Sequence, residues 1–417
     1  MFDELINGKK RMAFVGANSQ GKTYALEQII KNKNVKDHCI AVWSEVKSDE
    51  NMKNSADNST LMTWINRLID IQSIKDTLDV IIKDLDFSEI NNNSFLNISL
   101  SNAVESFKNL IGINVTTSSN IFGKPGSGEK FLAQLKVISK ILSENTDNVY
   151  QYLIIDEPER HLHPSLFKLV GTVLKEISNK NINVIIATHS PVILKYFIED
   201  TDEIFVFKNG EAKQIPSKKS FVNLIDAYNL YNEDKFKYES YSLIESKKEE
   251  YFELFFLPII LRCVFSKCVL LGEGHVEKEI FELLNERYSN EEILTNVQTE
   301  IVFGKCFFPW LISCFHECGL KVVALFDTDI KEDDDKTTNK YIKHNNCNNI
   351  IERTADGFVS LAPKIENILE IPDEKRSDKV KINLIEIRKR YMDNDLTVIN
   401  LLSNIYEAIK SIAKSSL

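Results

Sequence analysis

The chain has 417 residues, of which 43% are hydrophobic and 27% are charged, and its formal net charge is −10 at pH 7. This composition is typical of a soluble globular protein, and it excludes a disordered or fibrous chain. At about 100 to 200 residues per domain, the length predicts two or three domains. A nucleic acid could bind only through a local basic surface, because the overall negative field repels phosphates.

The sequence also indicates whether the chain has membrane or secretory segments and in what state its cysteines are. It contains no run of about 18 apolar residues, and its start lacks the apolar stretch of a secretory signal peptide, so we expect no membrane span and a cytoplasmic location. The seven cysteines include no CxxC pair, which favours reduced thiols. Cys314, His316 and Cys318 could bind zinc, but their spacing matches no zinc template and is more typical of a core helix.

A phosphate-binding pattern lies near the start of the chain. The apolar run 12–15 predicts a strand, residues 16–23 (GANSQGKT) match G-x-x-x-x-G-K-[ST], and a helical stretch follows. In this pattern backbone N–H groups and the helix N-terminus surround phosphate oxygens, a lysine adds a full positive charge, and the hydroxyl can bind Mg²⁺. The predicted ATP ligands in this loop are Gly16, Asn18, Gly21, Lys22 and Thr23, with Thr23 also a metal ligand.

The next segments predict an insertion and then an α/β sheet. Residues 46–120 are polar and rich in asparagine, with helical periodicity over 61–85, which predicts a mostly helical insertion. Helical spacing recurs over 131–142. The runs 152–155 and 184–187 are short and apolar, as in buried parallel strands. This alternation indicates an α/β fold.

Polar residues follow these two expected strands. Asp156 and Glu157 follow the first; an aspartate there can hold Mg²⁺, and the adjacent glutamate can orient an attacking water. His189 follows the second strand. Taken alone, His189 would be a loop residue, but in series with the other motifs it is a candidate contact to the γ-phosphate.

Together with the segment 125–130 (PGSGEK), these motifs resemble the ABC-type ATPases of the SMC and DNA-repair branch. Those proteins carry a Walker A motif, a signature of the form LSSGE, a Walker B strand ending in DEPE, an HLHP segment and a THSP histidine in this order. The resemblance covers about residues 10–195 and implies a P-loop ATPase head that dimerises. ATP would lie between the Walker A loop of one subunit and the signature loop of the other, here Ser127 and Gly128.

Two departures from this family pattern affect what the resemblance implies. Gly126 stands where the signature usually has a serine that contacts the partner's nucleotide, so efficient hydrolysis is not implied. The stretch before Gly16 is too short for the β-subdomain that normally contacts adenine, so we expect poor affinity or base selectivity.

A second α/β pattern begins after a charged, aromatic segment over 209–262 that predicts a helical connector. Strands are expected at 268–271, 300–303 and 321–326, with helices at 276–287 and 308–318. The predicted domain boundaries are 1–215, 216–262 for the connector, and 263–417.

Acidic residues follow the first and third of these strands. Glu273 and Glu277 come after the first, about one helical turn apart, and Asp327 and Asp329 come after the third, where residues i and i+2 point the same way. Carboxylates that converge in a parallel-sheet crevice repel one another unless a cation neutralises them, which indicates Mg²⁺ or Mn²⁺. Any one of them alone would more simply be a solvated acid, since the chain has 61 Asp and Glu residues.

These two acidic strand ends resemble a Toprim domain, and behind an ABC-type head they are similar to the overcoming-lysogenisation-defect (OLD) family of ATPase–Toprim nucleases. The stretches 255–274 and 302–305 are also similar to that family. The resemblance implies an α/β chain in which an ABC-type P-loop ATPase domain with a helical insertion precedes a Toprim domain with a parallel sheet. It further implies an ATP-regulated, metal-dependent DNA endonuclease.

The family also uses a late acidic residue and a lysine. Glu366 resembles the acidic residue, with Glu370 as its rival, and Lys379 and Lys381 are the candidate lysines. Both lysines lie in a basic stretch that could follow a DNA backbone or could be a solvated helix face.

By this resemblance, two metals would promote in-line hydrolysis of a phosphodiester. Glu273, Asp327 and Asp329 would hold the metals, and Glu277 and Glu366 could complete the second site. A homodimer or higher oligomer of the ATPase head would control the access of DNA to this metal site. The alternative reading is an ATP-responsive sensor of DNA or of a partner, with a silent Toprim site.

Family members commonly act in bacterial defence against phage, some with a helicase-like protein and others with a retron reverse transcriptase and its DNA. The segments 46–120 and 209–262 are where such a partner could dock.

Overall fold

The described part of the computed structural model divides into two units, Met1–Ala212 and Lys213–Leu417. The structure describes residues 10–16, 20–32, 35, 39–42, 131, 135, 138–139, 151–160, 162–208, 210–229, 247–302, 304–331, 334–362, 364 and 379–414. The helical insertion expected over 46–120 lies outside these residues.

A six-stranded sheet forms the centre of the first unit, with the strand order β2-β3-β4-β1-β5-β6. The pairings β2–β3, β3–β4, β4–β1 and β1–β5 are all parallel. Parallel strands covered on both faces consist of continuous apolar runs, as β1, β3 and β4 do. The strands are β1 (Arg11–Val15), β2 (Cys39–Val42), β3 (Tyr152–Asp156), β4 (Asn183–Ala187), β5 (Ile204–Lys208) and β6 (Glu211–Gln214).

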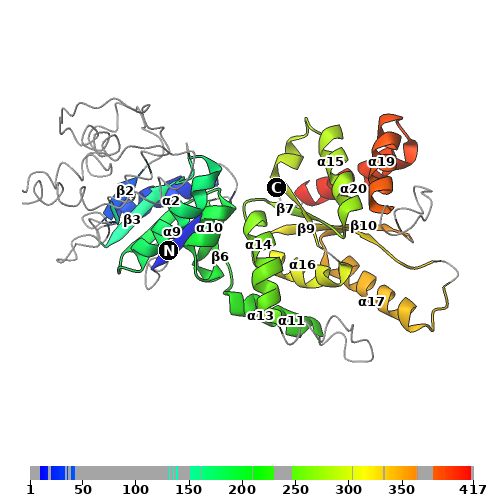
Figure 1. The fold of residues 1–417 in the computed structure, drawn as a ribbon, viewed down its shortest axis with the longest axis horizontal. Helices are drawn as coiled ribbons and strands as arrows, with labels where there is room; N and C mark the ends of the chain where they lie inside the picture. Colours follow the sequence, from blue (N-terminus) through cyan, green and yellow to red (C-terminus); the bar gives the residue numbers. More distant parts are fainter. Residues whose placement is uncertain are drawn as a thin grey trace, which may run out of the picture. The chain divides into compact units, whose positions relative to one another are not determined.

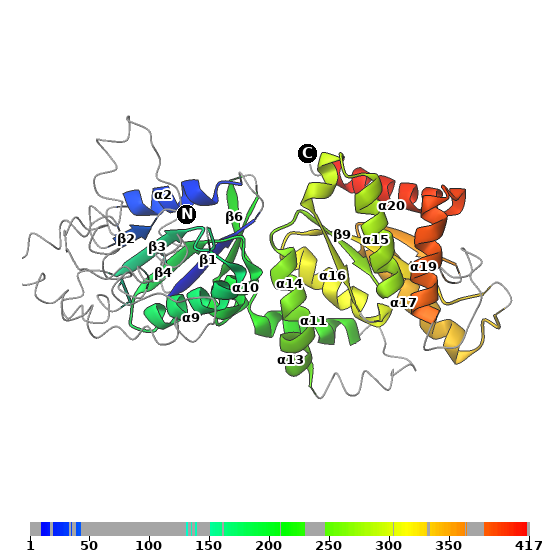
Figure 2. The ribbon, with the colours of Figure 1, turned by 45° about the horizontal axis from the view of Figure 1, so that its top comes forward.

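Helices cover both faces of this sheet (Figure 2). Helix α2 (Lys22–Lys31) lies on one face, and α9 (Phe167–Ser178) and α10 (Pro191–Phe197) lie on the other. Leu26 and Ile29 of α2 pack in one cluster with Phe14 of β1, and burying each such side chain contributes about 1.5–3 kcal/mol. This packing holds α2 against the sheet directly after the phosphate-binding pattern. Two short 3-10 helices complete the unit, η2 (Pro164–Leu166) and η3 (Thr201–Glu203).

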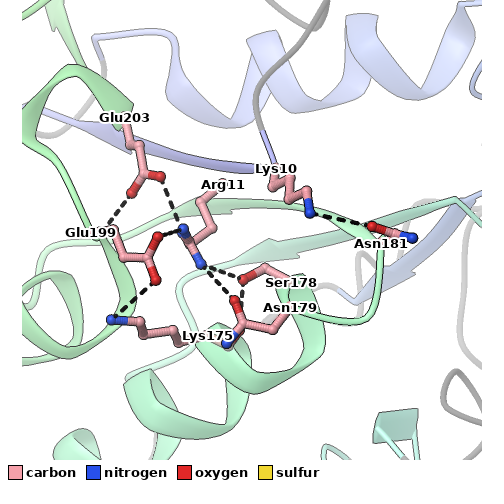
Figure 3. A network of polar contacts seen from close by, with 8 residues as sticks. All are labelled: Lys10, Arg11, Lys175, Ser178, Asn179, Asn181, Glu199 and Glu203. Atoms are coloured by element: carbon pink, nitrogen blue, oxygen red, sulfur yellow. Dashed lines mark hydrogen bonds and ion pairs between the residues drawn. The ribbon is translucent and has the colours of Figure 1, made fainter.

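A buried arginine lies at the start of β1, at the end opposite to the phosphate-binding pattern (Figure 3). Arg11 is 5% exposed. Its guanidinium forms ion pairs with Glu199 and Glu203 and donates to Ser178 Oγ and Asn179 Oδ1, each at 3.0 Å. A buried charge is costly unless it is paired, so this network ties β1 to the end of α9 and to the segment before β5.

The second unit contains a four-stranded sheet with the order β10-β9-β7-β8, and its three pairings are parallel. The strands are β7 (Cys268–Gly272), β8 (Val297–Ile301), β9 (Lys321–Asp327) and β10 (Gly357–Leu361). The predicted α/β class with parallel sheets is therefore confirmed. Strand β8 begins and ends earlier than the run expected at 300–303, because its VQTEI sequence is that of a half-exposed edge strand.

Figure 1 shows α15, α19 and α20 on one side of this sheet and α16 and α17 on the other. The core between the sheet and helices α15, α19 and α20 includes Leu270, Phe281, Leu325 and Leu402. The helices of this unit are α11 (Lys218–Asn229), α13 (Lys248–Tyr251), the π-helix η5 (Phe252–Phe256), α14 (Leu257–Cys263), α15 (His275–Arg287), η6 (Glu292–Asn296), η7 (Lys305–Phe307), α16 (Phe308–Glu317), α17 (Asn339–Thr354), α19 (Lys379–Met392) and α20 (Leu396–Lys414).

An aromatic cluster attaches the segment expected as a connector to α16. Trp310 is fully buried; its ring lies against Phe252 and Phe256, and its indole N–H donates to the carbonyl of Phe221 at 3.0 Å. Burying a tryptophan requires such a partner for its N–H. Helices α11, η5 and α14 therefore pack as part of the second unit.

The cysteines whose side chains are described are all buried and form no disulfide. Cys314, within α16, and Cys318, directly after it, are buried in the core, whereas His316 pairs with Asp356 at 2.9 Å. The core position expected for these cysteines is confirmed. No helix within the described ranges is long and apolar enough to cross a membrane.

Candidate functional site

The phosphate-binding pattern of the first unit depends on two glycines. Gly16 has φ of 136°, and a Cβ at this position would lie 2.5 Å from the carbonyl oxygen of Phe207. Gly21 has φ of 94° and is the N-cap of α2. Both conformations belong to the region that favours glycine, so the sequence can make this turn only with these residues. Asn18, predicted as a ligand from the same loop, lies outside the described residues.

Lys22 is buried at the start of α2, and its ammonium donates to the carbonyl oxygen of Gly16 at 2.9 Å. Burial lowers the pKa of Lys22, while the nearby carboxylates of Glu157, Asp156 and Glu159 act in the opposite direction. A positive charge is thus held across the mouth of the loop, which is where phosphates bind in this pattern.

Thr23 and Asp156 meet at the end of β3. The Thr23 hydroxyl lies 3.1 Å from Oδ2 and 3.3 Å from Oδ1 of Asp156. A hydroxyl and a carboxylate side by side next to the phosphate loop are the oxygen ligands that Mg²⁺ takes in P-loop nucleotide sites. These residues therefore fit a divalent cation next to the phosphates of a nucleotide.

Glu157 and His189 also come together in the structure. His189 Nε2 lies 3.9 Å from Glu157 Oε1, and Arg160 lies 3.6 Å from the other carboxylate oxygen. Glu157 has a left-handed backbone with φ of 49°, and its N–H donates to the Ala187 carbonyl at 2.8 Å, which holds it at the end of β4. Burial lowers the pKa of His189 and the charge of Lys22 lowers it further, while Glu157 opposes them, so the neutral imidazole is favoured near pH 7.

Glu159 belongs to this site but was not among the residues predicted from the sequence. Its carboxylate accepts hydrogen bonds from the Thr188 hydroxyl, at 2.7 Å, and from the backbone N–H of His189. Burial raises its pKa, although these hydrogen bonds oppose the shift. Glu159 thereby fixes the loop that carries His189. Its sequence signal is weak: it lies two residues beyond Glu157 in the run 156–160.

The acidic strand ends of the second unit lie at one edge of its sheet. Strands β7 and β9 are parallel neighbours, with Gly272 opposite Leu325, so Glu273 and Asp327 end next to each other. One carboxylate oxygen of Glu273 is buried and has no hydrogen-bond partner. Burial raises the pKa of Glu273 to about 7; the Lys305 charge opposes this shift, and Asp329 adds to it.

Asp329 has a left-handed backbone, with φ of 57°, and its carboxylate is contacted by two lysines and a histidine from three segments. Its oxygens lie 2.9 Å from Lys305 Nζ, 3.1 Å from Lys364 Nζ and 3.6 Å from His344 Nδ1. Burial raises the pKa of Asp329, but the hydrogen bonds and charges of the two lysines outweigh it, and the net shift is downward. Asn348, one helical turn after His344 on α17, donates to the Thr328 carbonyl at 2.9 Å.

Glu277 caps the helix that follows β7. Its Oε2 accepts the backbone N–H of Gly274 at 2.8 Å, and the residue is buried at the start of α15. A Cβ on Gly272 would lie 2.7 Å from the Cβ of Glu277, so only glycine fits between this helix and the strand end. Of the carboxylate oxygens predicted to bind metal, one is therefore engaged in the cap.

The residues of this edge fit a divalent cation in chemical type. Carboxylate oxygens are the ligands that Mg²⁺ and Mn²⁺ prefer, and the buried oxygen of Glu273 needs a partner. As the side chains stand, however, no group of three His, Cys, Asp or Glu residues in the described ranges is gathered closely enough to hold a metal. Two lysines neutralise Asp329 instead.

Several predicted site residues fall where the structure gives no side-chain geometry. Ser127, Gly128 and Glu366 lie outside the described residues, and of Lys379 and Lys381 only the backbone, within α19, is described.

Comparisons with known proteins agree with this arrangement. Residues 134–195 match the family described as an AAA domain, putative AbiEii toxin, Type IV TA system. Residues 264–329 match the family described as overcoming lysogenization defect protein-like, TOPRIM domain. These matches confirm the predicted order of an ATPase domain followed by a Toprim domain of the OLD-like kind.

The chain is also similar to curated proteins. It is 23% identical to the Old nuclease of Escherichia phage P2 over 64% of this chain and 45% of that protein. It is 22% identical to the endonuclease GajA of Bacillus cereus (strain VD045) over 70% of this chain and 47% of that protein. The aligned region thus spans about half the length of these relatives. An uncharacterized protein of Methanocaldococcus jannaschii, MJECL11, is 28% identical over 107 residues, which are 24% of this chain and 88% of that protein.

Proposed function

Because the chain combines an AAA-type ATPase domain with an OLD-like Toprim domain, the domain order of the OLD family, we propose that it is a metal-dependent DNA endonuclease regulated by ATP. The observation that carries the proposal is the edge formed by β7 and β9. There, a buried oxygen of Glu273 that lacks a hydrogen-bond partner lies beside the strand end that bears Asp327 and Asp329. The relatives named as nucleases support the same reading.

In this proposal Glu273, Asp327 and Asp329 hold Mg²⁺ or Mn²⁺. The ions, when bound, lower the pKa of a water and stabilise the leaving 3′ oxygen of a phosphodiester. Glu277 fixes the start of α15 beside Glu273 and would be a further ligand at the same edge. Glu366 remains the proposed late ligand.

Lys379 and Lys381, at the start of α19, remain the proposed contacts to the DNA phosphates. One of them would stabilise the charge that develops on the phosphate under attack.

The first unit would bind ATP with Mg²⁺ and act as the regulator. Gly16, Gly21 and Lys22 surround the phosphates, and Thr23 and Asp156 bind the ion. Asn18 would add a contact from the same loop. ATP binding, with weak hydrolysis, is sufficient for such control, because a ligand shifts a conformational equilibrium through its binding alone.

The other residues of the ATPase site would act on the γ-phosphate. Glu157 orients a water, and His189 contacts the γ-phosphate from the loop that Glu159 fixes. Ser127 and Gly128 would reach the nucleotide of a second subunit, so we propose a homodimer or a higher homo-oligomer.

We also propose a cytoplasmic role in defence against phage. A retron reverse transcriptase with its DNA, or a helicase-like protein, is the proposed partner, by resemblance to the OLD family. Co-purification of the tagged chain from its native host tests this proposal: recovery of one of these proteins supports it, and recovery of the chain alone contradicts it.

Incubation of supercoiled plasmid with Mg²⁺ or Mn²⁺, with and without ATP, tests the nuclease proposal. We expect wild-type protein to cut the plasmid, Asp327→Ala to abolish cutting, and Lys22→Ala to abolish the response to ATP while leaving the metal-dependent reaction. Asp335→Ala, which replaces an exposed acid on the loop after β9, is the matched control and should cut like wild type. Equal plasmid integrity with wild type and Asp327→Ala in every condition would exclude the nuclease.

One observation favours a second candidate, an ATP-responsive sensor of DNA or a partner whose Toprim site is silent. Lys305 and Lys364 both pair with Asp329, so this carboxylate already has counter-ions. In that case the plasmid would stay intact, but ATP would change the protein's affinity for DNA, measured by fluorescence anisotropy of a labelled duplex. Lys22→Ala should abolish this change.

A further inference from the structure

A buried lysine lies among the acidic strand ends of the second unit. Lys305 is 3% exposed and follows Gly304 at the start of η7. Its ammonium donates to the carbonyl oxygens of Asp327 and Thr328, at 2.7 and 3.0 Å, and lies 2.9 Å from Asp329 Oδ2. A lysine ammonium has three N–H donors, so these three partners use all of them.

The contacts of Lys305 do two different things. The two carbonyl contacts fix the backbone of the turn after β9, in which Asp329 adopts its left-handed conformation. The contact to Asp329 places a positive charge beside the carboxylates of the site. The same charge also acts on Glu273, whose pKa it lowers against the effect of burial. A charge this deeply buried is tolerated only because it is fully paired.

We propose that Lys305 is a positioning residue of the Toprim site: it holds the turn after β9 in place and serves as the internal counter-ion of Asp329, competing with a divalent cation for that carboxylate. This inference rests on the proposed function, because it takes Asp329 as a metal ligand. It assigns Lys305 two opposed effects, since its carbonyl contacts organise the metal ligands while its charge weakens metal binding.

Measuring metal affinity separates the effect of the Lys305 charge from the effect of its carbonyl contacts. The ammonium and a divalent cation are like charges, and they repel strongly where water is excluded. Mn²⁺ is titrated into the nucleotide-free full chain by calorimetry. Neutral Lys305→Met and Lys305→Gln should each bind Mn²⁺ about tenfold more tightly than wild type. Lys305→Arg keeps the charge and should stay within about threefold of wild type.

Lys364 supplies the matched control. It pairs with the same carboxylate, but its side chain is 47% exposed. Because solvent screens exposed charges, Lys364→Met should tighten Mn²⁺ binding by less than about threefold. A second readout is thermal unfolding. In EDTA, Lys305→Met should unfold at a lower temperature than wild type, and Mn²⁺ should raise that temperature more in the variant. A purely structural lysine would lower it equally with and without Mn²⁺.

The outcomes distinguish this inference from the proposed nuclease. If Asp329→Asn abolishes the tightest Mn²⁺ site but neither neutral Lys305 variant tightens it, only the counter-ion role is overturned, whether or not plasmid is cut. If Mn²⁺ binding is indifferent to Asp329→Asn, both the metal role of Asp329 and this inference are wrong.

Discussion

The hydroxyl of Thr23 lies 3.1 Å from a carboxylate oxygen of Asp156, although 133 positions separate the two residues in the chain. Strands β1 and β3 are both neighbours of β4, and the ends of parallel strands meet at one edge of a sheet. This relationship links the phosphate loop to the acidic end of β3, and it is the geometric basis for proposing a Mg²⁺–ATP site.

Replacing Thr23 by valine should weaken Mg²⁺-dependent ATP binding by about tenfold, or about 1.4 kcal/mol, because valine preserves the shape but removes the oxygen. Calorimetric titration of ATP with and without Mg²⁺ measures the effect. Tyr24→Phe is the control, since Tyr24 is 63% exposed and should leave affinity unchanged. An equal loss of affinity in EDTA would assign Thr23 a structural role instead.

Replacing Gly16 by alanine should lower the free energy of unfolding by about 2–3 kcal/mol, because its Cβ would meet the Phe207 carbonyl at 2.5 Å. Gly210→Ala makes a useful comparison. Gly210 also has positive φ, but among the described residues no atom apart from its chain neighbours lies within 4 Å of its Cβ position, so only backbone strain of about 1 kcal/mol is expected. Urea unfolding compares the two variants. Equal losses would show that the contact with Phe207 relaxes at little cost.

The sequence predicts most central strands of the two sheets well and the edge strands poorly; β5 (Ile204–Lys208), which lies between β1 and β6, is a central strand that it did not predict. Strands β7 and β9 are continuous apolar runs, expected at 268–271 and 321–326 and found at nearly the same residues. Strand β8, with the sequence VQTEI, has three polar residues between two apolar ones, and it is the edge strand of the sheet in the described part of the chain. Strand β10 (GFVSL) was not predicted for the same reason. An edge strand therefore lacks the pattern by which buried parallel strands are recognised.

The residues of the candidate sites also divide into those that the sequence predicts and those that it does not. Glycines and strand-end acids such as Gly16 and Asp156 stand in local patterns, so their neighbours in sequence identify them. Glu159 and Lys305 have no such pattern, because their partners come from other segments: Thr188 for the glutamate and the turn at Asp327 for the lysine. Their burial and pairing follow from the tertiary fold and required the structure.

Replacing Arg11 by methionine should destabilise the first unit by about 3–5 kcal/mol, because Glu203 and the polar ends of α9 would lose their buried partner (Figure 3). Lys10→Met is the matched control. Lys10 contacts only Asn181 among the interactions drawn in Figure 3, on the exposed surface, so a change within about 0.5 kcal/mol is expected. Chemical unfolding measures both. A loss below about 1 kcal/mol for Arg11→Met would mean that water replaces the network.

The carboxylate of Asp356 should make the second unit sensitive to acid. It accepts hydrogen bonds from Lys321 Nζ and from the Val322 N–H, each at 2.8 Å, and it pairs with His316. Burial raises the pKa of Asp356, but the Lys321 and Val322 hydrogen bonds and the His316 interaction outweigh it, so its pKa is lowered from the ordinary 3.8. A carboxyl whose pKa is lower in the folded state stabilises the fold above its unfolded value, and this contribution disappears as the pH falls through the folded value.

Asp356→Asn should therefore lower the free energy of unfolding at pH 7 by about 1 kcal/mol, a figure reduced for solvent screening, and the difference from wild type should vanish as the pH falls below the folded pKa. Urea midpoints for both proteins at pH 7 and pH 3 measure this dependence. Adding Lys321→Met to each protein completes a double-mutant cycle, and its coupling should shrink over the same interval. A difference between wild type and Asp356→Asn that stays constant with pH would place the cost of the variant in packing and not in the charge of Asp356.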